Sequence, residues 1–411
     1  MRYPRHNFVT ANAPPVFEPD VTRASRHRHT AESMLSFSDT PALFGAFALS
    51  AHLLSTALAA WRSRPRRPLP APEVAQAPGV TLVRPMCGLD HDARGLLAAT
   101  FALDYPKLEI LFCVERPDDA AIPLVREFLA AHPQADARLL IGTDHLSDNP
   151  KLNNMAKGWR GARYDLVCFT DSNLRVPRDY IQRVLAARQD DTGCVSAPPV
   201  GGAAVGLWAE VEAAFLNSFQ ARWQFAVDTI GFGFAQGKTL FFDRRDFAAI
   251  GGVAALAAEP AEDAAATKAV RSLGKKVNLV DPPFVQPLGR RTWRAVWNRQ
   301  LRWARLRRAT FPLLYVPELM TGALMPAIAT VLAAWARGYD VGPSLAGFLA
   351  VWYGAEAALT LAARWHFTIL TPFGWLLRDL MVPALWIAGL AGRSFVWRNP
   401  PVDEAASGAH G

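Results

Sequence analysis

Residues 165–173 read DLVCFTDSN, a short apolar run that ends in the carboxylate of Asp171. A similar pattern lies upstream, where residues 108–119 read LEILFCVERPDD and end in Asp119. Short apolar runs bounded by acids or turns are typical of buried strands, which predicts strands at residues 108–114 and 165–170. Open α/β sheets bind ligands beyond the carboxyl ends of their strands, so both carboxylates are candidates for one nucleotide-binding edge.

The segments around these two runs predict an α/β domain over residues 80–308. Further apolar runs at residues 80–86, 137–141 and 238–242 have the length of strands, and residues 120–131 place apolar side chains at helical spacing. Strands that alternate with helices indicate a mostly parallel central sheet that is covered on both faces.

The composition narrows the possible partners. Hydrophobic residues make up 51% of the 411 residues and charged residues only 19%, and the net charge is +8. A basic balance suits anionic partners, but the arginine cluster has no nucleic-acid recognition module around it, so no nucleic acid is expected as a partner. The four cysteines are too far apart for a metal knuckle and are predicted to be reduced thiols, which fits a cytoplasmic domain: Cys87, Cys113, Cys168 and Cys194.

Apolar segments flank this domain. Residues 42–61 contain no Asp, Glu, Lys or Arg and are long enough to span a bilayer. Arginines at positions 62, 64, 66 and 67 follow the run, which predicts that the domain after it lies in the cytoplasm. A cleaved signal peptide would carry its positive charge before the apolar run instead. Residues 1–41 are expected to be a disordered tail, of which the first 33 residues alternatively precede a start at Met34. Residues 62–79 are expected to be a basic, proline-rich linker.

The C-terminal block 309–392 predicts two or three membrane segments, at residues 313–335, 343–363 and 374–392, before a tail at 393–411. Arg393 and Arg398, if cytoplasmic, require an even number of spans after the domain. Glu356 lies inside the second segment. An acid there contacts either a lipid headgroup or a neighbouring helix within the bundle.

Three acids are candidates for chemistry, each with a structural alternative. Asp119 can accept hydrogen bonds from a uracil or ribose, or can cap a helix, with Asp118 as its rival. Asp171 can hold Mg²⁺ or Mn²⁺, or can form an Asx turn. Asp263 follows Glu262 before a helix-favouring stretch, and is either a base near an acceptor hydroxyl or an acid at a helix start.

A basic and aromatic segment closes the domain. Eight arginines lie between residues 290 and 308, and Trp293, Trp297 and Trp303 are interleaved with them. Arg299 and Arg302 can share one face of a helix, and guanidinium groups suit diphosphate oxygens. The tryptophans favour a membrane surface over a solvated basic face. Lys151 and Lys238 are weaker candidates for phosphate contact.

Taken in order, the segments VRPMCGLD, LDYPKLEILFCVERPDD, NPKLNN, FTDSN, AEDAAATKA and RQLRW resemble glycosyltransferase family 21, the ceramide glucosyltransferases. The resemblance covers residues 80–318. It implies a GT-A fold, cytosolic catalysis, UDP-glucose as donor, ceramide as acceptor and a divalent metal. Sequence details suggest a bacterial member, in an inner membrane, and the identity of the donor sugar stays open between glucose and another hexose.

The resemblance also implies roles for individual residues. Asp119 would contact the nucleotide, Asp171 the metal and diphosphate, and Asp263 would be the base. Lys151 stays a candidate contact of the nucleotide-sugar on its own sequence context. Arg299, Arg302 and Trp303 would cover the diphosphate and the acceptor. The alternatives are transfer to another lipid such as a hopanoid or diacylglycerol, a processive polysaccharide synthase, for which the spans are few, and a non-catalytic membrane lipid-binding protein.

Overall fold

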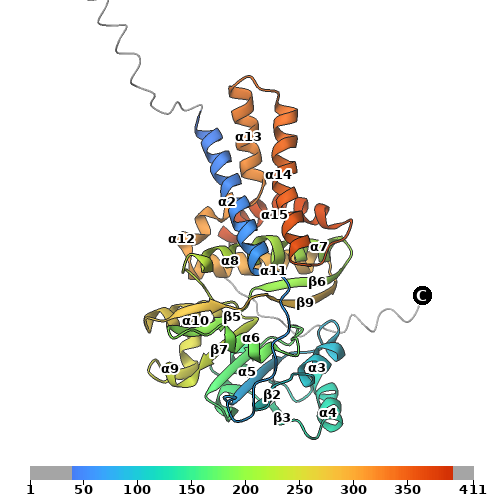
Figure 1. Ribbon diagram of the computed structural model, residues 1–411, viewed down its shortest axis with the longest axis vertical. Helices are drawn as coiled ribbons and strands as arrows, with labels where there is room; N and C mark the ends of the chain where they lie inside the picture. The colour runs from blue at the N-terminus through green and yellow to red at the C-terminus, as the bar shows by residue number, and fades with distance from the viewer. Residues whose placement is uncertain (1–38, 392–411) are drawn as a thin grey trace, which may run out of the picture.

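The computed structural model describes residues 39–391 (Figure 1). An α/β body lies at one end, a layer of helices crosses its top, and further helices project from that layer. The predicted N-terminal tail lies almost entirely outside the described residues, as do Met34, Arg393, Arg398 and the predicted tail 393–411.

The α/β body is built on a seven-stranded sheet in the order β3-β2-β1-β4-β7-β5-β8. Only β7 runs antiparallel to its neighbours, so the prediction of a mostly parallel sheet is confirmed. The strands are β1 (Val80–Met86), β2 (Leu108–Val114), β3 (Ala137–Ile141), β4 (Leu166–Thr170), β5 (Thr192–Ser196), β7 (Thr239–Asp243) and β8 (Lys276–Leu279).

Helices cover both faces of this sheet. They are α3 (Ala93–Phe101), α4 (Ala121–Ala131), α5 (Pro150–Gly161), α6 (Tyr180–Ala186), α9 (Arg244–Ala248), α10 (Glu262–Ser272) and the 3₁₀ helix η2 (Gly252–Ala257). Successive strand residues enter opposite cores, since Val83 packs with Trp159 of α5 whereas Leu82 packs with Tyr180 of α6. This burial on both faces explains why the central strands are continuous apolar runs.

A second layer, which we call the platform, lies above the sheet edge that carries the candidate acids (Figure 1). It contains the parallel pair β6 (Pro199–Val205) and β9 (Phe284–Arg290). Its helices are α7 (Leu207–Ala214), the π-helix η1 (Phe215–Ala221), α8 (Arg222–Thr229), α11 (Trp293–Thr310), α12 (Pro312–Tyr315) and the 3₁₀ helix η3 (Val316–Met320). The basic and aromatic segment of the sequence is therefore the helix α11.

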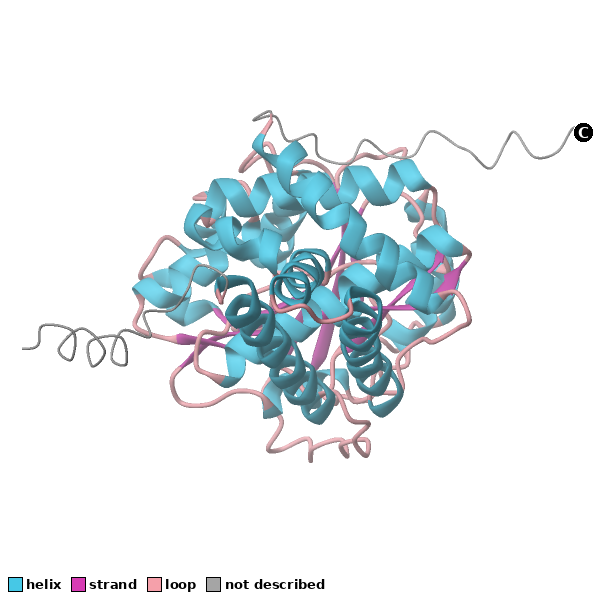
Figure 2. Ribbon diagram, turned by 90° about the horizontal axis from the view of Figure 1, so that it is seen from above, coloured by secondary structure: helices cyan, strands magenta, loops and turns pink. Residues whose placement is uncertain are grey.

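Three described helices are long and apolar enough to cross a membrane: α2 (Thr40–Arg62), α14 (Val341–Ala362) and α15 (Thr371–Leu390). Pro312–Met320 and α13 (Leu324–Ala336), bent by 49°, would make a fourth if they count as one span. Helices α2, α13 and α14 form a bundle that Figure 2 views from above. Helix α15 instead packs along α7 and α11 at the level of the platform. The expected number of C-terminal spans stays a prediction.

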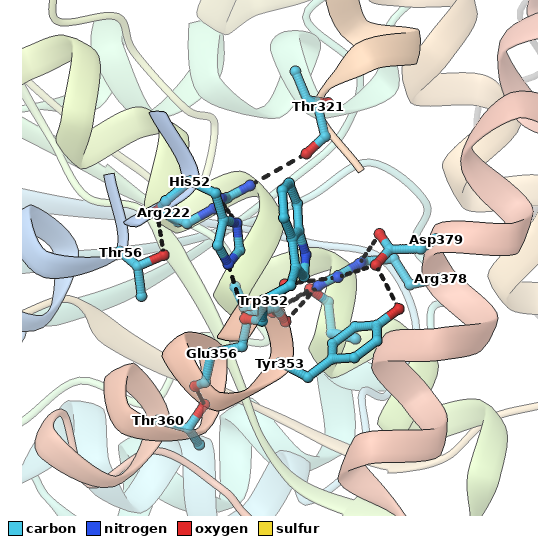
Figure 3. Close-up of polar contacts among 12 residues, drawn as sticks. His52, Thr56, Arg222, Thr321, Trp352, Tyr353, Glu356, Thr360, Arg378 and Asp379 are labelled. Atoms are coloured by element: carbon cyan, nitrogen blue, oxygen red, sulfur yellow. Dashed lines mark hydrogen bonds and ion pairs between the residues drawn. The ribbon is translucent and has the colours of Figure 1, made fainter. Parts of the chain in front are cut away.

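A buried polar cluster joins these helices to the platform (Figure 3). Glu356 of α14 is fully buried and accepts two hydrogen bonds from Arg378 of α15, at 2.8 and 2.9 Å, and one from Ser218 of η1 at 2.6 Å. Arg378 also pairs with Asp379, which accepts a hydrogen bond from Tyr353 at 3.0 Å. Of the two alternatives for Glu356, the structure favours an acid paired within the bundle.

The other half of the cluster anchors α2. Arg222 of α8 contacts His52 of α2, and the His52 ring stacks on Trp352 of α14 with centroids 3.7 Å apart. Arg222 and Arg378 carry charges opposite to those of Glu356 and Asp379, so these four side chains have no net formal charge. It fixes α2, α14 and α15 against the helices that lie above the candidate site.

Candidate active site

The site forms where β4 ends and β7 begins. Because these strands are antiparallel, Asp171 directly after β4 lies beside Lys238 directly before β7, and the Asp171 amide donates to the Lys238 carbonyl at 3.2 Å. The Lys238 ammonium contacts Asp171 Oδ2 at 2.9 Å and donates to Asn173 Oδ1 at 2.9 Å. One oxygen of Asp171 is thereby paired.

Lys151 reaches the same carboxylate from the first turn of α5. That helix begins at Asn149, whose Oδ1 accepts from the amides of Lys151 and Leu152, and Pro150 suits the first helical position. The Lys151 ammonium lies 2.7 Å from Asp171 Oδ1, 2.6 Å from Glu262 Oε1 and 2.7 Å from the Gly237 carbonyl oxygen. These three contacts use all three of its protons.

Asp263 lies in the first turn of α10, next to Glu262. Its Oδ2 accepts from the Gly237 amide at 3.1 Å and its Oδ1 from the Ala264 amide at 2.8 Å. Burial and the neighbouring Glu262 raise the pKa of Asp263 to about 6, against the opposing effects of Lys151 and the two amides. A carboxyl group with this pKa can accept a proton near neutral pH. Asp263 is thus both an acid at a helix start and part of the candidate site.

The charges around Asp171 are fixed by their pairing. Burial alone would raise the pKa of Asp171, but Lys151 and Lys238 hold it well below its usual range. Burial lowers the pKa of Lys151, yet Asp171 and Glu262 raise it above its usual range. Both groups therefore stay ionised at neutral pH, whereas Asp263 titrates close to it.

Asp119 lies at the end of β2 and is linked to this cluster through the loop after β1. Its two oxygens accept from the Gly88 amide, each at 3.0 Å, and Oδ1 also accepts from the Ala121 amide at 2.8 Å. In the same loop, Asp90 accepts a hydrogen bond from Ser172, the residue after Asp171. Asp118, the rival acid, is exposed and paired with Arg116 instead.

Helix α11 lies on the platform side of the site. Arg299 contacts Glu212 of α7 at 2.7 Å, and its guanidinium lies over the Trp303 ring, 5.9 Å from the ring centroid. Burial lowers the pKa of Lys238, and the charge of Arg299 lowers it further, against the opposing effect of Asp171. Arg302 lies on the same helix. The structure thus brings together every predicted site residue except Asp119, which joins through the loop, and Arg302 and Trp303, which flank it on α11.

Sequence reasoning missed several residues of this cluster. Glu262 pairs with the Lys151 ammonium, and Asn149 accepts a hydrogen bond from the Lys151 amide. Asn149 Nδ2 also donates to Glu262 Oε2 at 3.0 Å. Asn173 binds Lys238, and Gly237 contacts both Lys151 and Asp263. The signals were present in the Asn-Pro-Lys helix start and in the paired acids of AED.

The expected divalent metal does not fit the groups that surround Asp171. Each oxygen of Asp171 faces a lysine ammonium, and Asn173 is bonded to Lys238 where a second carboxylate would be needed. Within residues 39–391, no group of three or more His, Cys, Asp or Glu side chains is arranged to hold a metal ion. Mg²⁺ and Mn²⁺ prefer several oxygen ligands, so this donor set does not suit either ion.

The comparison with known proteins points to one family. A family model described as glycosyl transferase family 21 matches residues 47–404. Ceramide glucosyltransferase 1 of Caenorhabditis elegans is 28% identical over 329 residues, which cover 78% of this chain and 71% of that protein. Ceramide glucosyltransferase of Komagataella phaffii is 39% identical over 126 residues, covering 30% of this chain and 24% of that protein.

Among solved structures, the mannosyltransferase PcManGT from Pyrobaculum calidifontis, in complex with GDP-Man and Mn²⁺, covers 85% of this chain and 98% of its own. The sequence identity is 20% and the TM-score 0.46.

Proposed function

The chain belongs to glycosyl transferase family 21, whose model matches most of its length, and from that premise we propose that it transfers glucose from UDP-glucose to the primary hydroxyl of ceramide. The relatives named ceramide glucosyltransferase support ceramide as the acceptor. The observation that carries the proposal is Asp263, a partly buried carboxyl with a pKa of about 6 beside the Lys151–Asp171 pair.

Asp263 is the base in this proposal. It accepts the proton of the ceramide hydroxyl, and the oxygen attacks the anomeric carbon of the sugar from the face opposite UDP. The bond between that carbon and the diphosphate oxygen breaks, and UDP leaves with the electron pair. One displacement inverts the configuration and gives a β-glucoside.

The other residues bind and orient the donor. Asp119 contacts the uracil or ribose at the end of β2. Lys238 uses two of its protons to contact Asp171 and Asn173, and its third proton contacts the diphosphate. Arg299 and Arg302 also offset the charge of the diphosphate. Trp303 covers the acceptor. Mg²⁺ or Mn²⁺ would stabilise the leaving diphosphate if one bound, but the groups around Asp171 do not suit it.

The location at a membrane follows from the same architecture. The platform lies between the sheet edge and the candidate membrane helices, so a lipid hydroxyl at the bilayer surface can approach Asp263 from the platform side. The arginines after α2 support a cytoplasmic catalytic body, and we propose a bacterial inner membrane as its site.

Product analysis tests this proposal. Membranes containing the protein would receive ceramide, diacylglycerol or a hopanoid, each with labelled UDP-glucose, UDP-galactose or UDP-glucuronic acid. We expect a labelled ceramide product that disappears in Asp263→Asn and persists in Asp246→Asn, an acid in the first turn of α9 that pairs with Lys275. A product on another lipid alone would refute ceramide as the acceptor. Wild-type turnover in Asp263→Asn would remove that residue from the role of base.

A further inference from the structure

We propose that the diphosphate site of this protein has a built-in cation, in which the ammonium groups of Lys151 and Lys238 take the place of a divalent metal ion. The inference rests on the proposed function, because it concerns how the leaving diphosphate is stabilised. Its consequence is that glycosyl transfer proceeds without Mg²⁺ or Mn²⁺.

Lys151 occupies the position of an ion. Its ammonium is surrounded by one oxygen each from Asp171, Glu262 and the Gly237 carbonyl, at 2.6 to 2.7 Å. Carboxylate and carbonyl oxygens are also the ligands that Mg²⁺ prefers. Asn149 donates a hydrogen bond to the other oxygen of Glu262, so the position of this carboxylate beside Lys151 is fixed by a second protein contact.

Lys238 completes the set on the opposite oxygen of Asp171. It is buried, with 11% of its side chain exposed, and its ammonium contacts Asp171 and Asn173 at 2.9 Å each. An asparagine oxygen binds an ammonium well but carries no charge for a metal. A metal ion that approaches Asp171 must therefore displace an ammonium group from one of its oxygens.

The cluster already holds the charge that a metal would bring. Lys151 and Lys238 supply two positive charges, the same number as a divalent ion, and Asp171 and Glu262 are the acids that they contact directly. Lys238 uses two of its protons on Asp171 and Asn173, which leaves the third for the incoming diphosphate.

Binding of UDP in the presence and absence of metal tests the inference. Purified full-length protein in detergent would be treated with EDTA, and the Kd for UDP would be measured by calorimetry in EDTA and again in Mn²⁺. The transfer rate and the binding of Mn²⁺ alone, by electron paramagnetic resonance, would be measured in parallel. We expect the Kd and the rate to agree within about twofold between the two conditions, and no protein-bound Mn²⁺ signal.

A loss of UDP affinity or transfer of about tenfold in EDTA that Mn²⁺ restores would overturn the inference, as would tight binding of Mn²⁺ alone. If UDP binds equally in both conditions but no donor and lipid give a product, the proposed function fails while the inference stands. If UDP binds in neither condition, both fail.

Lysine variants give a second measurement. Lys238→Met should weaken UDP binding by about tenfold or more, since a hydrogen bond to a charged group is lost. Lys276→Met is the matched control, because Lys276 lies at the start of β8 and its ammonium pairs with the exposed Asp191. This variant should bind UDP as the wild type does. Unchanged affinity in Lys238→Met would contradict the inference, and if this variant fails to fold the wild-type comparison in EDTA still decides.

Discussion

The pH dependence of transfer should report the pKa of Asp263, and replacing Glu262 by glutamine should move it. Burial and Glu262 raise this pKa from 3.8 to about 6, with burial the larger cause. The ionised fraction of the base then rises from about 10% at pH 5 to about 90% at pH 7. Because Glu262 accounts for the smaller part of the change, Glu262→Gln should shift the acid limb to lower pH by less than about one pH unit.

Initial rates of transfer in detergent between pH 4.5 and 8 measure this shift. Glu259→Gln is the matched control, because Glu259 lies just before the same helix but pairs with Lys268 and is outside the cluster. Its acid limb should coincide with that of the wild type. An acid limb near pH 4 in the wild type, or one that does not move in Glu262→Gln, would refute the role of the pair.

Three further predictions concern stability, each measured by thermal unfolding in detergent. Asp263→Asn should abolish transfer yet stabilise the protein at pH 8 by about 1–3 kcal/mol. The pKa of Asp263 is raised in the folded state, so the carboxyl contributes its full stability below pH 3.8 and loses it as the pH rises through about 6. Equal midpoints at pH 8 would contradict this. Arg299→Ala leaves Glu212 buried and unpaired and should cost about 3–5 kcal/mol, most of which a second change, Glu212→Gln, should restore. Additive losses in the double variant would show that the pair is not coupled. Glu356→Gln removes the charge that faces Arg378 and should cost about 3 kcal/mol, so an unchanged midpoint would rule out the pairing described here.

The strands that the sequence predicts are those with a recognisable apolar run, and of these β1, β2, β4 and β7 are buried on both faces whereas the edge strand β3 is partly exposed. β1, β2 and β3 have the predicted bounds, and β4 and β7 differ from them by one residue. The missed strands lack a continuous apolar run: β6 contains Gly201 and Gly202, and β8 begins with Lys276. Their pairing is set by neighbours that are distant in sequence, which no local pattern reveals.

The sequence predicted where the acids of the site lie along the chain, but not which side chains they pair with. Strand ends and helix starts located Asp119, Asp171 and Asp263, because such positions follow from local periodicity. That Lys151 and Lys238 both face Asp171 follows from the antiparallel placement of β7 and the entry of α5, which are properties of the folded sheet. The expectation of a metal at Asp171 rested on the acid alone, because the sequence does not show that two ammonium groups occupy its oxygens.

The neutral cluster around Glu356 has a consequence for how the protein is made. A charged side chain at the centre of a bilayer costs about 2.5–3.5 kcal/mol on insertion scales. During synthesis, α14 leaves the ribosome before Arg378 of α15 exists, so Glu356 has no partner until the next helix emerges. Pairing of Glu356 with Arg378 is therefore expected to wait until α15 has emerged, and docking of Ser218 from the already synthesised platform would complete the cluster.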